Sequence, residues 1–330
     1  MFELQFAAAN TAGIASILAF WIFIGSAALR RLQQTMLKLG MLTLAVAFIA
    51  MTAAIVARGI ASGRFPLSNL YESLLWFAWS TAGGFLCLGK LYPIRQLGWL
   101  ASLSIATVFL YGSWLPASQH DMSPLAPALV SYWRQIHVPP LIASYALFLL
   151  SGLASLAALW AQGAKLSVAG AAGALAMAII AIGLGTYTNI NTAVLQGVFV
   201  GGSLVGLTAS WLNLRQIQSC AVDEKASDLY DEVAQRAVLI GLPLLTVGII
   251  TGALWANHAW GSYWSWDPKE SMALVTWLSY ATYIHLRIKR FCTTGQLSVV
   301  AVAAMILTLL TYLGFSALGL AGLHSYGRIK

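Results

Sequence analysis

The densest group of side chains that could do chemistry lies at residues 255–270, in the run WANHAWGSYWSWDPKE. Four tryptophans and a tyrosine stand close together there: Trp255, Trp260, Tyr263, Trp264 and Trp266. An interfacial aromatic belt, with indole rings at the level of the lipid headgroups, accounts for one or two tryptophans at a helix end. Four in so short a span, interleaved with glycine and serine, favour a flat aromatic shelf for a large planar ligand.

Five histidines could act as metal ligands: His120, His137, His258, His285 and His324. Histidine is the commonest metal ligand in proteins, and a neutral imidazole binds iron readily. A single histidine in a membrane protein is nonetheless more often a hydrogen-bonded interior or interfacial residue. The elements that carry each histidine therefore decide which of them are candidates.

The composition is that of a protein that crosses a membrane many times. Of the 330 residues, 59% are hydrophobic and 8% are charged, with a mean hydropathy of +0.78. A soluble globular domain has about 25% charged residues, so that class is excluded. The net charge of +8 comes from basic residues in short loops, which is a topology signal and predicts no nucleic-acid partner. Cys87, Cys220 and Cys292 form no CxxC pair, so neither a disulfide framework nor a thiol-redox motif is predicted.

Ten apolar runs are long enough to cross a membrane as helices. They are residues 10–29, 38–57, 71–89, 97–115, 138–161, 168–187, 192–212, 237–255, 271–289 and 297–318. The pair within 168–212 is rich in glycine and alanine, and the count becomes eight if that pair does not span. The predicted fold is therefore an all-α polytopic membrane protein, a single integral membrane domain over residues 1–330.

Charge counting gives the predicted orientation. With the N-terminus outside, 12 of the 18 Lys and Arg residues fall in inner loops, which favours both termini on the periplasmic or lumenal side. The tryptophan-rich stretch is then outside, and the charged residues 214–236 form a solvated, helical connector in the cytoplasm. Residues 58–75 form a second unusual outer stretch, in which Ser68 or Asn69 is expected to cap a helix with Glu72 in its first turn.

This topology places three histidines at two depths. His137 stands just before the fifth run and His324 follows the last one, so both imidazoles are expected at the level of the tryptophans. Two such imidazoles could bind iron on opposite faces of a planar macrocycle. His285 lies about 21 Å into the ninth run, at about 1.5 Å per residue, too deep to share that iron. An ionisable residue inside a membrane is a functional candidate, and here its opposite ligand would have to come from a partner.

The run WGSYWSWDPKE resembles the tryptophan-rich WWD signature of haem-handling proteins, most closely that of the CcsA/ResC-type subunit of the System II cytochrome c synthase. The segment SGRFPLSNLYESL is similar to one near the N-terminus of that family. The contexts QIHVPP and GLHSYG match the two external haem histidines of the family, and YIHLR matches its intramembrane haem ligand. Residues 165–213 show no such match.

The resemblance implies a role in cytochrome c biogenesis. The outer site would bind haem b, and the chain, with a CcsB/ResB-type partner that supplies a second intramembrane histidine, would deliver haem and attach it covalently to CxxCH motifs of apocytochrome c. The chain would then be part of a cytochrome c haem lyase, with thioredoxin-like thiol reductants as further candidate partners. The expected location is a bacterial plasma membrane or a thylakoid membrane, with the haem site facing the periplasm or lumen.

The implied site has two parts. The cofactor-binding residues are His137, His285, His324, Trp255, Trp260, Tyr263, Trp264, Trp266 and Asp267, with the three histidines as axial ligands of haem iron. Arg134, Lys269 and Arg328 are candidates to bind the haem propionates, although basic residues are also ordinary at membrane boundaries. Asp267 and Pro268 are equally well explained as a helix start.

Two other readings remain open. The first is a haem exporter or chaperone of the System I kind, which presents haem without forming thioether bonds; the DPKE continuation and the SNLYESL segment favour the synthase over it. The second is a transporter unrelated to haem, with an aromatic belt and incidental histidines. His258 stands where many members of the family have an acid, so it is expected to be a surface or supporting residue. His120 is expected to be solvated.

Overall fold

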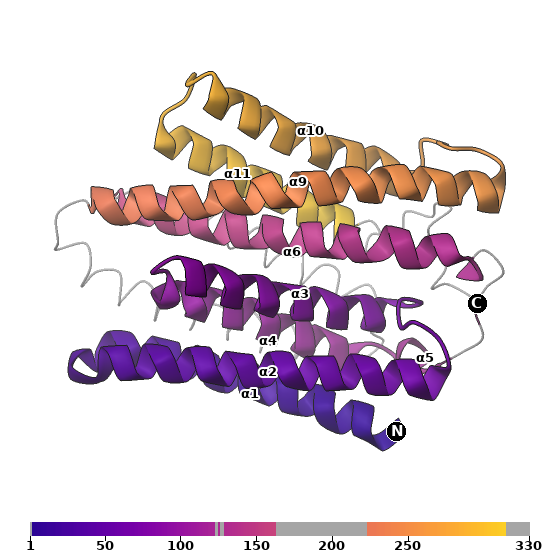
Figure 1. Cartoon of the computed structure of the whole chain (residues 1–330), viewed down its shortest axis with the longest axis horizontal. Coiled ribbons are helices and arrows are strands. Elements are labelled where there is room, and N and C mark those ends of the chain that lie inside the picture. The colour runs from indigo at the N-terminus through magenta and orange to yellow at the C-terminus, as the bar shows by residue number, and fades with distance from the viewer. Residues whose placement is uncertain (1, 123–124, 126–128, 163–222, 315–330) are drawn as a thin grey trace, which may run out of the picture. The chain divides into compact units, whose positions relative to one another are not determined.

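The computed structural model describes residues 2–122, 125, 129–162 and 223–314, and every regular element in these ranges is a helix (Figure 1). The chain divides into two compact units, and α6 and α9 contribute to both. Within the described ranges, unit 1 comprises residues 2–150 and 240–265. Unit 2 comprises residues 151–162, 223–239 and 266–314.

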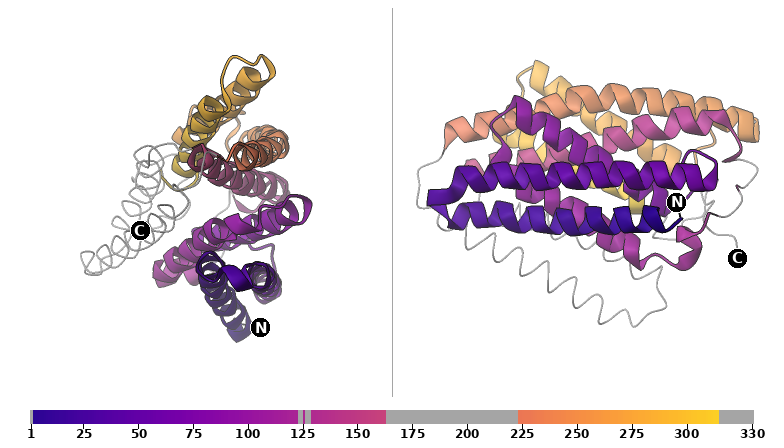
Figure 2. Two further views of the ribbon diagram at one scale, coloured as in Figure 1. Left: turned by 90° about the vertical axis from the view of Figure 1, so that its left-hand side faces the viewer. Right: turned by 60° about the horizontal axis from the view of Figure 1, so that its bottom comes forward.

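Four long helices of unit 1 lie side by side (Figures 1 and 2). They are α1 (Phe2–Ala28), α2 (Gln33–Ser62), α3 (Leu70–Leu91) and α4 (Gly98–Trp114). Short turns join them: η1 (Arg30–Leu32), η2 (Arg95–Leu97) and α5 (Ala117–His120), which follows α4. Helix α1 contacts α2 and α4, and α3 contacts the same two helices. Fully buried small residues such as Ala12, Ala19 and Ala47 let these backbones approach closely, as in other membrane helix bundles.

Two further helices pack antiparallel in unit 1, namely α6 (Tyr132–Ala161) and α9 (Glu224–Trp260). Gly241 of α9 lies against Phe148 of α6, and Gly248 of α9 lies against Leu141. The numbering falls along α6 as it rises along α9, which fixes the antiparallel sense.

Helix α6 begins earlier than the sequence predicts. The prolines at 139 and 140 suggest an entry at Val138, but the helix starts at Tyr132. The hydroxyl of Ser131 accepts a hydrogen bond from the backbone N–H of Trp133 at 3.3 Å, which caps the additional turns. His137 therefore lies within the helix rather than at its entrance.

Unit 2 contains α10 (Pro268–Ile288), α11 (Thr294–Leu309) and the π-helical turn η4 (Leu310–Gly314). Buried hydroxyls join them: the Oγ1 atoms of Thr276 and Thr311 lie 2.8 Å apart, and Thr308 Oγ1 donates to Tyr280 Oη at 3.4 Å. These contacts hold α10 against α11.

Seven helices in the described part of the chain are long and apolar enough to cross a membrane: 3–28, 30–62, 70–91, 95–114, 132–161, 224–260 and 294–313. The expected span at 271–289 is helical as α10 but falls outside this set, because His285, Arg287 and several serine, threonine and tyrosine residues make it more polar. The expected spans at 168–187 and 192–212 lie outside the described residues.

The charged connector predicted at 214–236 is largely part of a long helix. Residues 224–236 are the first turns of α9, so the expectation of helix is confirmed there. The expectation that this segment is solvated is wrong for Asp231, which is buried and accepts two hydrogen bonds from Arg287. A carboxylate of α9 that is bound to an arginine of α10 is a structural link within unit 2.

Candidate functional site

His137 lies in α6 against a face of α9 that is formed by Gly248 and Gly252. Its Nδ1 atom is 2.7 Å from the carbonyl oxygen of Gly248, and its ring fills the space beside Gly252. The backbone of the neighbouring helix therefore holds one nitrogen of the imidazole.

Two indoles continue from this imidazole along the last turns of α9. The ring centroids of His137 and Trp255 are 5.7 Å apart, and those of Trp255 and Trp260 are 5.6 Å apart. The rings are tilted by 41° and 44°. Trp255 is buried and Trp260 is half-buried. Of the predicted cofactor-binding residues, these three form one continuous aromatic row.

The remaining aromatics lie in the loop after α9. Gly261, with a φ of 77°, ends the helix and turns the chain. The Ser262 hydroxyl donates to the Trp264 carbonyl at 3.0 Å and stabilises the loop. Tyr263 and Trp266 are exposed, and the backbone of Trp266 has a φ of 58°. A left-handed conformation is unusual for so bulky a residue.

Asp267 is the N-cap of α10, as expected. It accepts a hydrogen bond from the backbone N–H of Lys269 at 2.8 Å, Pro268 occupies the first turn, and Glu270 completes a capping box. Burial lowers the pKa of Lys269, while the neighbouring Asp267 carboxylate opposes that shift. The positive end of the helix dipole also disfavours a cation in this first turn.

His285 lies in the last turn of α10, on a face whose residues are exposed at every third or fourth position. The exposed residues along it are Val275, Leu278, Thr282, His285 and Ile288. The opposite face of α10 carries the buried residues Thr276, Tyr280 and Tyr283. Thr282 and His285 therefore interrupt an otherwise apolar exposed stripe.

The comparisons with known proteins identify the family. The family model described as "Cytochrome C assembly protein" matches residues 67–324. The "Cytochrome c biogenesis protein CcsA" of Synechococcus elongatus is 35% identical over 316 residues, covering 94% of this chain and 93% of the relative. The protein of the same name from Pyropia yezoensis is 38% identical over 317 residues, with the same coverage. The chain belongs to this family. It is a CcsA-type cytochrome c biogenesis protein and an integral membrane protein, as the sequence predicts.

The family match includes all three candidate iron ligands. His137, His285 and His324 fall within residues 67–324, as does the whole tryptophan-rich stretch. His324 and Arg328 lie outside the described residues, so the structure brings together only part of the predicted site. Their roles stay predictions.

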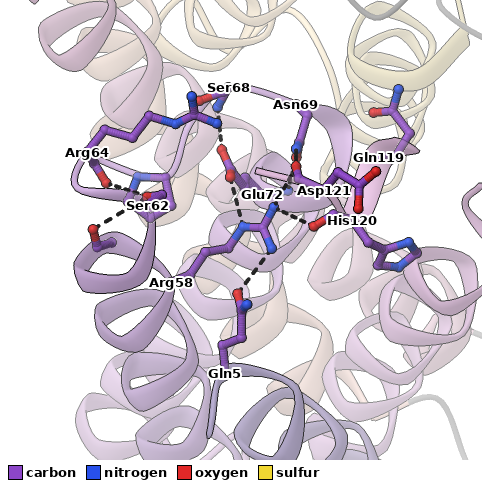
Figure 3. A network of polar contacts seen from close by, with 12 residues as sticks. Gln5, Arg58, Ser62, Arg64, Ser68, Asn69, Glu72, Gln119, His120 and Asp121 are labelled. Carbon is purple, nitrogen blue, oxygen red and sulfur yellow. Dashed lines mark hydrogen bonds and ion pairs between the residues drawn. The ribbon is translucent and has the colours of Figure 1, made fainter. Parts of the chain in front are cut away.

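Unit 1 contains a buried polar network that the sequence does not predict (Figure 3). The Arg58 side chain is fully buried and donates from Nε to the Glu72 carboxylate at 2.8 Å. Its Nη1 donates to Gln5 Oε1 at 3.1 Å, and its Nη2 donates to the carbonyl of His120 at 3.0 Å. The guanidinium also lies 5.1 Å from the ring centre of Tyr71. One arginine thus ties together α1, α2, α3 and α5.

The same network fixes the start of α3. Asn69 is the N-cap and accepts from the backbone N–H of Glu72 at 2.9 Å, which confirms one of the two expected caps. The second carboxylate oxygen of Glu72 accepts from the backbone N–H of Ser68. From the sequence alone, residue 58 begins the outer stretch and Glu72 lies in the first turn of a helix, with no pairing predicted between Arg58 and Glu72. An arginine and a glutamate that flank a proline-containing turn between apolar helices are the signal that could have found the pair.

The other two described histidines, His258 and His120, differ in their surroundings. His258 is exposed in the last turn of α9, in line with the expected surface position. The expectation that His120 is solvated is wrong. Its Nε2 lies 3.0 Å from the carbonyl of Gly112, and its ring packs 4.7 Å from that of Tyr71. His120 is a structural residue of the network around Arg58.

Arg134 lies one helical turn before His137 on α6. It is buried, and its Nη1 donates to the hydroxyl of Ser68 at 3.0 Å. An arginine so close to the aromatic row, next to the cap of α3, remains a candidate to bind an anionic group of a ligand. Lys269, the second candidate within the described residues, belongs to unit 2.

Proposed function

We propose that this chain holds haem b on its outer side and, with a CcsB/ResB-type partner, attaches it covalently to apocytochrome c. The observation that carries the proposal is the row formed by His137, Trp255 and Trp260. An imidazole that can bind iron stands beside two indoles that can cover a porphyrin face. Family membership supplies the biological setting, cytochrome c biogenesis.

The chemistry of this row suits haem better than a simple metal ion. Haem brings four nitrogen ligands of its own, so the protein needs to supply only axial ligands and flat apolar surface. His137 would be one axial ligand and His324 the other. Trp264, Trp266, Tyr263 and Asp267 would complete the rim, with Asp267 acting through the helix start that it caps.

The attachment reaction requires positioning more than catalysis by side chains. Each client thiol adds across one haem vinyl group: sulfur bonds to one vinyl carbon, and the thiol hydrogen ends on the other. No group leaves and no oxidant is consumed. Thioredoxin-like reductants would keep the two client thiols reduced before this step. Holding thiol and vinyl together lowers the entropic part of the barrier, which is the usual gain from orientation.

The propionates of haem need positive or hydrogen-bonding partners. Arg134, one turn from His137 and hydrogen-bonded to Ser68, is the best supported of the candidates. Lys269 is the second candidate, because a nearby carboxylate would oppose the effect of burial on its pKa.

The exposed stripe of α10 favours the proposal that a partner subunit binds at His285. A histidine and a threonine that face lipid would leave polar groups in hydrocarbon, which is costly. A helix of a CcsB/ResB-type subunit that lay along this stripe would remove that cost, and a histidine on it would supply the opposite ligand. The site at His285 would thus be shared between two chains.

The membrane is proposed to be a bacterial plasma membrane or a thylakoid membrane. CcsA proteins of Synechococcus elongatus and Pyropia yezoensis are among the relatives, which favours the thylakoid. The haem site would face the lumen or the periplasm.

The deciding experiment compares the chain purified with its partner against three variants, His137→Gly, His285→Gly and His324→Gly. The absorption spectrum reports bound haem, and covalent haem on a co-expressed CxxCH cytochrome reports attachment. We expect the variants to lose both. His258→Gly is the matched control, since it changes an exposed histidine at the end of α9. Unchanged spectra and intact cytochrome in all three variants would refute the proposal. Loss of haem with normal attachment would support the exporter instead.

A further inference from the structure

The contact between His137 and Gly248 has a direction that follows from elementary chemistry. A carbonyl oxygen accepts hydrogen bonds and cannot donate them. Its separation of 2.7 Å from Nδ1 of His137 therefore requires the hydrogen to be on Nδ1. In the neutral ring the lone pair then belongs to Nε2, the nitrogen on the other side of the ring.

Gly252 makes this contact sterically possible. A Cβ atom placed on Gly252 would lie 2.5 Å from Cε1 and 2.7 Å from Nδ1 of His137, well inside van der Waals contact. Gly248 and Gly252 are four residues apart, so they share a face of α9. The first supplies the acceptor and the second supplies the room for the ring.

We propose that Gly248 and Gly252 are positioning residues for iron ligation, which fix His137 in the Nδ1–H tautomer and aim Nε2 at haem. This inference rests on the proposed function, since it assumes that His137 binds haem iron. Metal-binding histidines usually donate their other N–H to a carbonyl or carboxylate, which fixes the ring and raises the basicity of the ligating nitrogen. Here the second helix supplies that carbonyl from its backbone.

Thr251 shares the same acceptor. Its single hydroxyl hydrogen is shared between the Val247 carbonyl, 2.7 Å from the hydroxyl oxygen, and the Gly248 carbonyl, 3.1 Å from it. Removing this hydroxyl leaves the Gly248 carbonyl a better acceptor for the His137 N–H. A stronger hydrogen bond makes the imidazole more electron-rich and stabilises oxidised iron. The variant Thr251→Val is therefore expected to lower the reduction potential of the haem without changing the packing around Gly252.

The first test reads the tautomer directly in the full-length chain without haem. Chains labelled with ¹⁵N-histidine are compared by solid-state NMR, and the His137 signals are assigned by their loss in His137→Asn. We expect the Nδ1–H form in the unmodified chain and a shift toward the Nε2–H form in Gly252→Ala. The matched control is Gly241→Ala, because a Cβ there meets Phe148 at 2.7 Å on the same pair of helices. This control should leave the tautomer unchanged. A hydrogen on Nε2 in the unmodified chain would overturn the inference.

The second test uses haem itself in the complex with the partner. Gly252→Ala is expected to weaken haem binding about 10- to 100-fold, the usual loss when a residue that orients a metal ligand is disturbed. Gly241→Ala should keep normal affinity. Normal affinity in Gly252→Ala, or a reduction potential in Thr251→Val equal to that of the unmodified chain, would refute the positioning role. Normal haem binding in His137→Gly would instead reject the proposed function, and the NMR result would show separately whether the tautomer was assigned correctly.

Discussion

The two described candidate ligands stand in opposite surroundings. His137 is half-buried within its own chain: a backbone carbonyl holds one nitrogen, and an indole lies beside the ring. His285 is exposed at the end of α10, on a stripe that is otherwise mostly apolar. This difference supports the proposal that the site at His137 is organised within the chain, whereas a second chain would complete the site at His285.

The two units also differ in their ion pairs. In unit 1, Arg58 and Glu72 have side-chain exposures of 1% and 0%. In unit 2, Arg287 and Asp231 are joined by two hydrogen bonds of 2.7 and 2.8 Å, but the Arg287 side chain is 21% exposed. After one partner is removed, water can therefore reach the Arg287–Asp231 site more easily than the Arg58–Glu72 site.

The largest expected effect comes from breaking the buried pair. Arg58→Met leaves the Glu72 carboxylate buried without its partner, which costs about 3–5 kcal/mol. Arg287→Met is the matched change in unit 2 and should cost about 1.5–3 kcal/mol, because Asp231 can gain water. Denaturation of the purified variants in one detergent measures both values.

A double variant checks the interpretation of the first change. Arg58→Met combined with Glu72→Leu removes both charges, so it should recover much of the lost stability. Equal losses for Arg58→Met and Arg287→Met would contradict the assigned difference between the two environments. A double variant as unstable as Arg58→Met would show that the arginine acts through Gln5 and the His120 carbonyl rather than through Glu72.

The second prediction concerns the partner. In the chain purified alone, His137→Gly is expected to lower haem retention about 10-fold or more, while His285→Gly changes it little. In the complex, His285→Gly should also lower haem content, because only there would its iron have two ligands. Quantified haem per mole of protein, with and without the partner, measures this. Equal sensitivity of the isolated chain to both variants would remove the distinction between an internal and a shared site.

Local rules made much of the fold predictable from the sequence. The apolar run at 71–89 became α3, and Asn69 caps it because its side chain suits that position. Asp267 and Pro268 begin α10 for the same kind of reason. Such helix starts depend on residues that are only a few positions apart in the chain, and these neighbours can be read directly from one sequence.

Contacts between distant segments could not be predicted in this way. Arg58 and Glu72 are 14 residues apart on different helices, and His137 and Gly248 are 111 apart. Composition gives no sign of either pairing. The start of α6 differs from the prediction because the two prolines favour a helix start at Val138, whereas the Ser131 hydroxyl caps the helix one residue before Tyr132. The sequence thus located the candidate ligands, while the means of holding His137 became visible only in three dimensions.

The smallest predicted effect tests whether the loop conformation of Trp266 serves ligand binding or the fold. Its left-handed backbone, with a φ of 58°, costs about 1–3 kcal/mol in comparison with an ordinary conformation. Glycine adopts this conformation readily but loses about 0.5–1 kcal/mol through its greater freedom in the unfolded chain. Trp266→Gly is therefore expected to leave the stability unchanged or to raise it by about 1 kcal/mol.

The same substitution is expected to lower haem retention, because an indole that is 72% exposed contributes surface to a ligand rather than to the core. Trp260→Gly is the control: it removes a half-buried indole that packs against Trp255 at the end of α9, so stability and haem retention should fall together. Parallel melting curves and haem titrations separate the two cases. If Trp266→Gly lost as much stability as Trp260→Gly, its conformation would be one that the fold itself requires. Stability gained with haem lost would mean that the strained backbone is maintained for the ligand.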